Sequence, residues 1–92
     1  MPSIRRLVWD AWNRDHIARH QVTPEGVGEV FWGAPVFRDS YENLILAIGP
    51  TLSGRMLTVA LDSEDEEGVY NPVTAWPTSR RERRRYSEAE GG

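Results

Sequence analysis

The sequence contains no cysteine, no lysine and no long hydrophobic run. Without cysteine, a disulfide framework and a thiolate zinc site are both excluded. The longest purely apolar run is Leu44–Ile48, five residues long, whereas a membrane-spanning helix needs about 20. The first nine residues hold no apolar stretch of the length that a secretory signal needs. We therefore expect a cytoplasmic protein that does not cross a membrane.

The length of 92 residues predicts one small domain that spans residues 1–92. Hydrophobic residues make up 39% of the chain and charged residues 27%, which is typical of a folded globular domain rather than a disordered or fibrous chain. This size excludes large multi-domain enzymes and dinucleotide-binding folds.

The charges are segregated along the chain, although the formal net charge is only −3. All eleven basic residues are arginines, and five of them lie between Arg80 and Arg85. Five acidic residues lie between Asp62 and Glu67. Because arginine binds phosphate and carboxylate groups in a bidentate manner, the arginine cluster predicts a surface for RNA or for an acidic protein. The alternative is a solvated helix face that the acidic segment partly balances.

Two helix starts can be recognised in the first third of the chain. Asp10 can cap a helix that runs to about His20, because its side-chain oxygen can accept from the unpaired amides of the first turn. Thr23 followed directly by Pro24 is a typical start of a second helix. A short strand is expected before the first helix, over residues 4–9.

Beyond Pro35 the apolar period changes from 3.6 towards 2, which indicates strands. A last helix is expected after Pro77, reaching about Ala89 and carrying the arginine cluster. This order predicts an α+β domain with a short N-terminal strand, two helices, a mainly antiparallel sheet and a C-terminal arginine-rich helix. Helices should cover one face of the sheet, and the other face should be half-open. The predicted strands are 36–39, 43–48, 55–62 and 69–75.

Alternation along the last strand places Tyr70 and Trp76 on the same, open side of the sheet. Rings of this kind can stack on unpaired bases, and the alternative is that they only cover the edge of the core. Pro72 indicates that this strand is an edge strand or contains a bulge. The residues expected to form one core are Ile17, Val30, Phe31, Ile45, Leu57, Val59 and Leu61.

His16 and His20 are one helical turn apart, but the H-E-x-x-H zinc pattern is absent. We expect His16 to pack beside Trp12. The acidic segment 62–68 has its glycine at the seventh position, not at the sixth position that a calcium loop requires. The sequence therefore predicts no metal site and no cofactor. Arginine, histidine and tyrosine are left as the candidate catalytic residue types.

Five short motifs, taken together and in this order along the chain, are informative about the family of the protein. They are WD at 9–10, HIARHQVTPE at 16–25, EVF at 29–31, GRMLTV at 54–59 and VTAWPTSRRERRRY at 73–86. This set resembles the BrnT family of bacterial toxins, and the C-terminal motif is its most specific part. The resemblance implies a RelE-like fold and the activity of a metal-independent endoribonuclease. It also implies two partners, namely RNA and the cognate antitoxin of a type II toxin–antitoxin system.

The resemblance also implies roles for individual residues. Cleavage without a metal requires a group that transfers the proton of the 2′-hydroxyl and cations that stabilise the phosphorane. Residues at matching positions are expected to do this: His20 or Tyr86 for proton transfer, and Arg55, Arg80 and Arg81 for charge stabilisation.

Other residues are expected to bind RNA, namely Trp76, Arg84 and Tyr70. The family usually has arginine where this chain has Trp76, and often where it has Pro50. A second hypothesis is therefore a catalytically degenerate module that binds an antitoxin or RNA without cleavage. Under both hypotheses, a homo-oligomer of this chain is a further expected partner arrangement.

Overall fold

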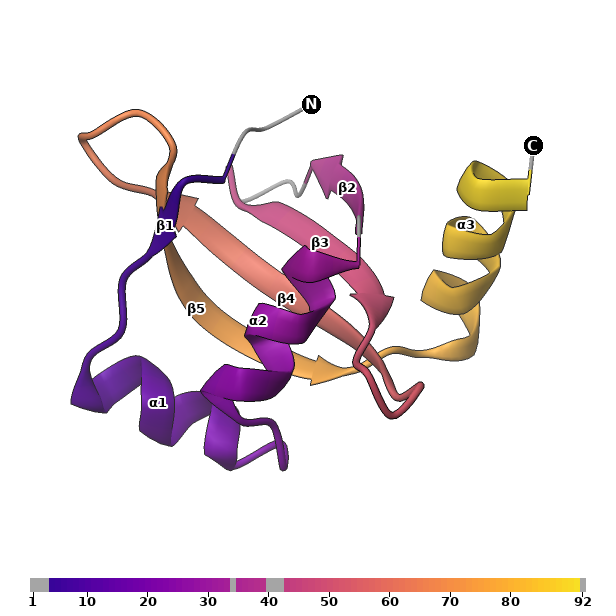
Figure 1. Ribbon diagram of the computed structural model, residues 1–92, viewed down its shortest axis with the longest axis horizontal. Coiled ribbons are helices and arrows are strands. Elements are labelled where there is room, and N and C mark those ends of the chain that lie inside the picture. Colours follow the sequence, from indigo (N-terminus) through magenta and orange to yellow (C-terminus); the bar gives the residue numbers. More distant parts are fainter. Residues whose placement is uncertain (1–3, 34, 40–42, 92) are drawn as a thin grey trace.

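Over residues 4–33, 35–39 and 43–91, which the computed structural model describes, five strands form one mixed sheet (Figure 1). The strand order is β1-β5-β4-β3-β2; β1 pairs with β5 in parallel, and the other neighbours are antiparallel. The predicted α+β class and the mainly antiparallel sheet are thus confirmed. The elements are β1 (Arg6–Leu7), α1 (Ala11–Ala18), α2 (Pro24–Trp32), β2 (Val36–Asp39), β3 (Ile45–Pro50), β4 (Met56–Ser63), β5 (Val69–Pro77) and α3 (Arg80–Gly91).

Both predicted helix caps are confirmed. The Asp10 side chain accepts from the Asn13 amide at 2.8 Å, and the Thr23 hydroxyl accepts from the Gly26 amide at 3.0 Å. The first helix is shorter than predicted, because it ends at Ala18 rather than near His20. Beyond Ala18 the chain turns back on itself, with Gln21 in the left-handed region at φ 60°. This turn redirects the chain into α2.

The predicted strand over 4–9 is reduced to Arg6–Leu7. The amides of Arg5 and Arg6 both donate to the Gly68 carbonyl, at 2.7 and 3.2 Å, so no regular ladder precedes Arg6. After Val8, the chain leaves the sheet for the Asp10 cap. At the other end of the sheet, β5 extends two residues beyond its predicted end, and β3 both begins and ends two residues later than predicted.

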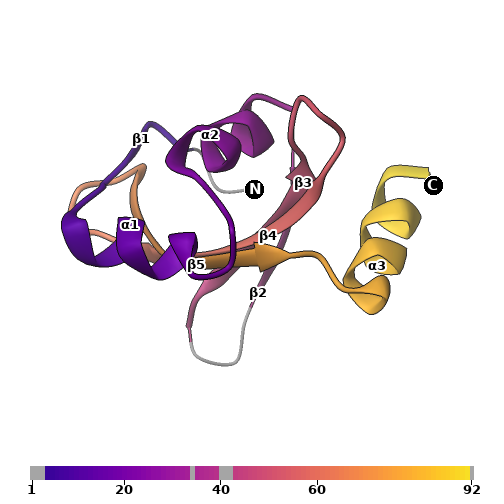
Figure 2. The same cartoon turned by 90° about the horizontal axis from the view of Figure 1, so that it is seen from below.

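The predicted core is confirmed. Alternate residues of β4 face α1 and α2, which lie on the same side of the sheet (Figure 2). Fully burying one large apolar side chain contributes roughly 1.5–3 kcal/mol to stability, so the cluster of buried apolar side chains between β4 and the two helices is the main source of stability of the fold. Ile17, Val30, Leu57, Val59 and Leu61 are buried in one cluster, and Phe31 and Ile45 pack against it.

The prediction that Tyr70 and Trp76 share one side of the sheet is wrong. Ala60 pairs with Thr74 but Leu61 pairs with Pro72, so β5 has one extra residue at this point. Such a bulge reverses the alternation of side chains along the strand. Tyr70 consequently packs against the core cluster, whereas Trp76 follows the buried core residue Ala75 and lies on the opposite face. The expected bulge near Pro72 is present.

The face opposite the core is less open than predicted. Thr58 and Ala60, which alternate with the core residues of β4, are 0% and 2% exposed. Helix α3 contacts β3 and β2, the two strands beyond β4. The Thr78 hydroxyl, just before α3, lies 3.1 Å from the Thr58 hydroxyl in a buried hydrogen bond. This bond fixes the start of α3 to the sheet.

The acidic segment forms the β4–β5 turn, as predicted, and its carboxylates are exposed. This turn and α3 lie at opposite ends of the molecule in both views (Figures 1 and 2). They are joined by β5, whose nine residues span about 30 Å. The acidic turn is therefore too distant to balance the charge of α3, and its Glu66 instead pairs with Arg6 at 3.3 Å.

Candidate functional site

Most of the predicted site residues lie at one end of the sheet. At this end Pro50, the last residue of β3, pairs with Met56, and Leu57 pairs with Pro77, the last residue of β5. Arg55 directly precedes β4, and α3 begins three residues after β5. The β3–β4 turn, the end of β5 and the start of α3 therefore lie at the same end of the sheet.

Arg55 is exposed and fixes the α1–α2 connection to this end of the sheet. Its Nη1 donates to the Gln21 carbonyl, and its Nη2 donates to the His20 carbonyl at 3.4 Å. Carbonyls that follow a helix lack helical partners and carry partial negative charge, so they favour a cation. A guanidinium has five N–H donors, so these two bonds leave Arg55 with the capacity to bind a phosphate as well.

The β3–β4 turn is held on both sides by hydrogen bonds. The Thr51 amide donates to the Arg55 carbonyl at 2.8 Å, and the Arg55 amide donates to the Thr51 hydroxyl at 3.2 Å. The Leu52 amide donates to Oε1 of Glu29 on α2 at 3.0 Å. Gly54 completes the turn at φ 89°, a conformation that side chains rarely adopt. The turn therefore places Arg55 firmly opposite α2.

A cleft of about 170 Å³ lies between α2 and this turn. It combines one guanidinium, two carboxylates and several hydroxyls, so it favours an anion only beside Arg55 and hydrogen-bond donors beside the carboxylates. The sequence predicted Arg55 but missed Glu25 and Glu29, because Glu25 is an ordinary acidic residue of a first helical turn and nothing local indicates that Glu29 faces a distant turn. The cleft is lined by Gln21, Thr23, Glu25, Gly26, Glu29, Thr51, Ser53, Arg55 and Leu57.

His20 lies next to this cleft through its backbone, since its carbonyl binds Arg55. The residue is exposed, and its ring centroid lies 6.5 Å from that of His16 in a tilted arrangement. His16 in turn stacks on Trp12 at 4.8 Å, which confirms the predicted packing of these two rings. The backbone of His20 therefore lies beside Arg55, while its ring lies near that of His16 and is not among the residues that line the cleft.

The predicted residues of α3 line up along one helix. Arg80, Arg81 and Arg84 are exposed, and Arg80 and Arg84 are one turn apart on the same face. Tyr86 is half-buried and lies about 9 Å further along the axis than Arg80. Arg85, which also belongs to the arginine cluster, has a side chain that lies outside the described part of the structure.

The two predicted stacking rings are far apart. Trp76 pairs with Thr58 and is half-buried at the end of β5 that leads into α3. Tyr70 pairs with Leu7 and Ser63 near the other end of β5, about 20 Å away along the strand. Trp76 therefore lies at the same end of the sheet as Arg55 and the start of α3, although on the face opposite the Arg55 cleft, and Tyr70 lies at the other end.

Within residues 4–33, 35–39 and 43–91, no three acidic or histidine side chains are arranged to hold a metal ion. No helix in this part of the chain is both long and apolar enough to cross a membrane. No protein-family model, no curated protein and no solved structure matches the chain.

Proposed function

We propose that this protein is the toxin of a bacterial toxin–antitoxin pair and that it cleaves RNA without a metal ion. The observation that carries the proposal is the position of Arg55, which is exposed in a cleft at the end of the sheet where α3 begins. A phosphate in this cleft would meet the guanidinium, and the arginines of α3 would bind neighbouring phosphates of the same strand. The resemblance of residues 54–59 and 73–86 to BrnT motifs supports the same assignment.

The proposed reaction is an attack of the RNA 2′-hydroxyl oxygen on the adjacent phosphorus. The bond from phosphorus to the 5′-oxygen breaks, so the products are a 2′,3′-cyclic phosphate and a 5′-hydroxyl. His20 or Tyr86 would take the proton of the 2′-hydroxyl, and the 5′-oxygen would take a proton from water as its bond to phosphorus breaks. Arg55, with Arg80 and Arg81, would stabilise the negative charge of the phosphorane.

A cleavage assay tests this proposal directly. Purified protein should cut a 5′-labelled single-stranded RNA in EDTA and leave a 2′,3′-cyclic phosphate. The matched control is the same RNA with a 2′-deoxyribose at the cleaved position, which should stay intact because it lacks the nucleophile. The nuclease proposal is wrong if neither a naked RNA nor a ribosome-bound messenger is cut.

The arginines of α3 should carry a salt-dependent affinity for RNA. If three of them neutralise one phosphate each, the affinity for single-stranded RNA falls roughly as the second power of salt concentration. A fourfold rise in salt should then weaken binding by about 20-fold. The triple variant Arg80→Glu, Arg81→Glu, Arg84→Glu should lose both the affinity and this salt dependence, as measured by fluorescence anisotropy.

A variant with the same net charge is the control for this experiment. Arg5, Arg14 and Arg19 are also exposed, but they belong to the segment before β1, to α1 and to its C-terminal cap. Their triple reversal to glutamate should leave most of the affinity intact if α3 is the RNA-binding surface. Equal losses in both triple variants would show that only the overall charge matters, and α3 would then have no special role.

The second candidate function is a binding module without catalysis. It is favoured by the bonds of Arg55 to two backbone carbonyls, which give this arginine a structural role, and by tryptophan at position 76. The substitution Trp76→Arg separates the two functions. A nuclease with one degenerate position should cut RNA faster with arginine there, whereas a binding module should cut RNA in neither form.

A further inference from the structure

A second concave surface lies on another side of α2, between this helix and β1. The groove has a volume of about 370 Å³. Helix α2 supplies Glu25 and Glu29 to the Arg55 cleft, and it supplies Gly28 and Trp32 to this groove. The two sites therefore use different faces of one helix. The groove is lined by Ile4, Arg5, Arg6, Leu7, Gly28, Phe31 and Trp32.

Trp32 is the most unusual residue of the groove, because it is 90% exposed. Tryptophan is among the side chains that contribute most to protein interfaces when a partner covers them. Phe31, the residue before it, packs against the core and lies 6.3 Å from the ring of Phe37. The floor of the groove is thus anchored in the core, while the indole of Trp32 remains uncovered in the isolated chain.

No described residue packs against Gly28 in a way that requires glycine. Glycine in a helix interior is unfavourable relative to alanine, yet a Cβ atom at this position would meet no described atom within 4 Å. Gly28 and Trp32 are four residues apart and therefore lie on the same face of α2. A bare stretch of helix backbone beside an exposed indole is the arrangement that allows a partner to approach closely.

The charge of the groove indicates the chemistry of that partner. Arg5 and Arg6 are both exposed on its β1 side. Arg6 pairs with Glu66 at 3.3 Å, whereas Arg5 has no ion pair among the described residues. In addition, β1 ends the strand order of the sheet, so its outer edge pairs with no other described strand.

We propose that this groove binds an acidic segment of a partner protein. One large apolar side chain of that segment would lie over Gly28 against Trp32, and its carboxylates would bind Arg5 and Arg6. The inference does not rest on RNA cleavage, since none of these residues belongs to the Arg55 cleft or to α3.

The test is a selection of peptides against the purified 92-residue protein. A phage-displayed library of random 12-residue peptides is passed over the wild-type protein, after removal of phage that bind the Trp32→Ala variant. The selected peptides should be enriched in aspartate and glutamate around one aromatic or leucine residue. Their affinity, measured by fluorescence anisotropy, should fall at least tenfold with Trp32→Ala and fall strongly with Arg5→Glu.

Two further variants separate docking from stability. Gly28→Ala should raise the melting temperature by about 4 to 8 °C, because alanine favours the helix, and yet it should weaken peptide binding. The control is Trp12→Ala, which removes a tryptophan that is 59% exposed on α1 and should leave peptide binding unchanged.

Three results would overturn the proposal. The first is a selection that yields no peptides enriched in acidic residues. The second is peptides that bind the Gly28→Ala and Arg5→Glu variants as well as the wild type. The third is a wild-type dimer in analytical ultracentrifugation that Trp32→Ala abolishes, since the groove would then hold a second copy of the chain.

Discussion

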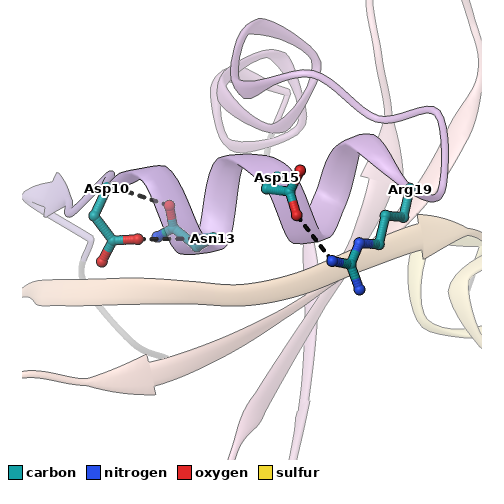
Figure 3. A network of polar contacts seen from close by, with 4 residues as sticks. All are labelled: Asp10, Asn13, Asp15 and Arg19. Atoms are coloured by element: carbon teal, nitrogen blue, oxygen red, sulfur yellow. Dashed lines mark hydrogen bonds and ion pairs between the residues drawn. The ribbon is translucent and has the colours of Figure 1, made fainter.

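Replacing Asn13 by alanine is expected to lower the free energy of unfolding by about 2 to 4 kcal/mol. The Asn13 side chain is fully buried and connects three parts of the fold, and Figure 3 shows its bonds with Asp10 at the start of α1. Its Nδ2 donates to the Val8 carbonyl at 2.8 Å and to Oδ1 of Asn71 at 2.9 Å. Its Oδ1 accepts from the Asp10 amide at 2.9 Å. Alanine would remove these hydrogen bonds from partly buried partners, and an unpaired polar group away from water costs more than the bond itself contributes.

Urea unfolding followed by circular dichroism measures this loss. Figure 3 also shows the matched control on the same helix, the Asp15–Arg19 ion pair at 3.0 Å. Both of its side chains are largely exposed, so Asp15→Ala should change stability by less than about 1 kcal/mol. If Asn13→Ala and Asp15→Ala were equally mild, the buried network would not be holding α1 on β5.

The sequence was a good guide wherever a local rule decides the structure. Asp10 and Thr23 cap their helices as expected, because a cap depends only on residues within one turn. The inward-facing residues of β4 were predicted because the strand alternates regularly from Leu57 to Leu61. A strand with no bulge and one buried face leaves only one register that hides its apolar side chains.

The sequence was a poor guide wherever distant segments meet. Pro72 indicated a bulge but not its exact place, and one extra residue was enough to put Tyr70 on the core face. The role of Asn13 depends on Asn71, which is 58 positions away in the chain. The carboxylates of the Arg55 cleft come from α2, which approaches the β3–β4 turn only in the folded chain. Such meetings depend on tertiary packing, which no local pattern encodes.

Substituting Arg55 by alanine is expected to lower kcat/KM for RNA cleavage by about two orders of magnitude, if this guanidinium stabilises the phosphorane. The control Arg14→Ala removes one exposed positive charge from α1 and should leave kcat/KM nearly unchanged. Because Arg55 also binds the carbonyls of His20 and Gln21, the melting temperature of each variant has to be measured beside the rate.

Arg55→Lys distinguishes the catalytic role of Arg55 from its structural role. Lysine keeps the positive charge but lacks the planar fork that can bind two carbonyls and a phosphate together. A catalytic role therefore predicts that lysine restores part of the rate lost in alanine, at a temperature where both variants are folded. If Arg55→Ala instead lowers the melting temperature while the folded protein cuts RNA at the wild-type rate, Arg55 only connects the α1–α2 link to β4. Phosphate stabilisation would then have to come from α3, where Arg80 and Arg81 are the exposed arginines nearest to this end of the sheet.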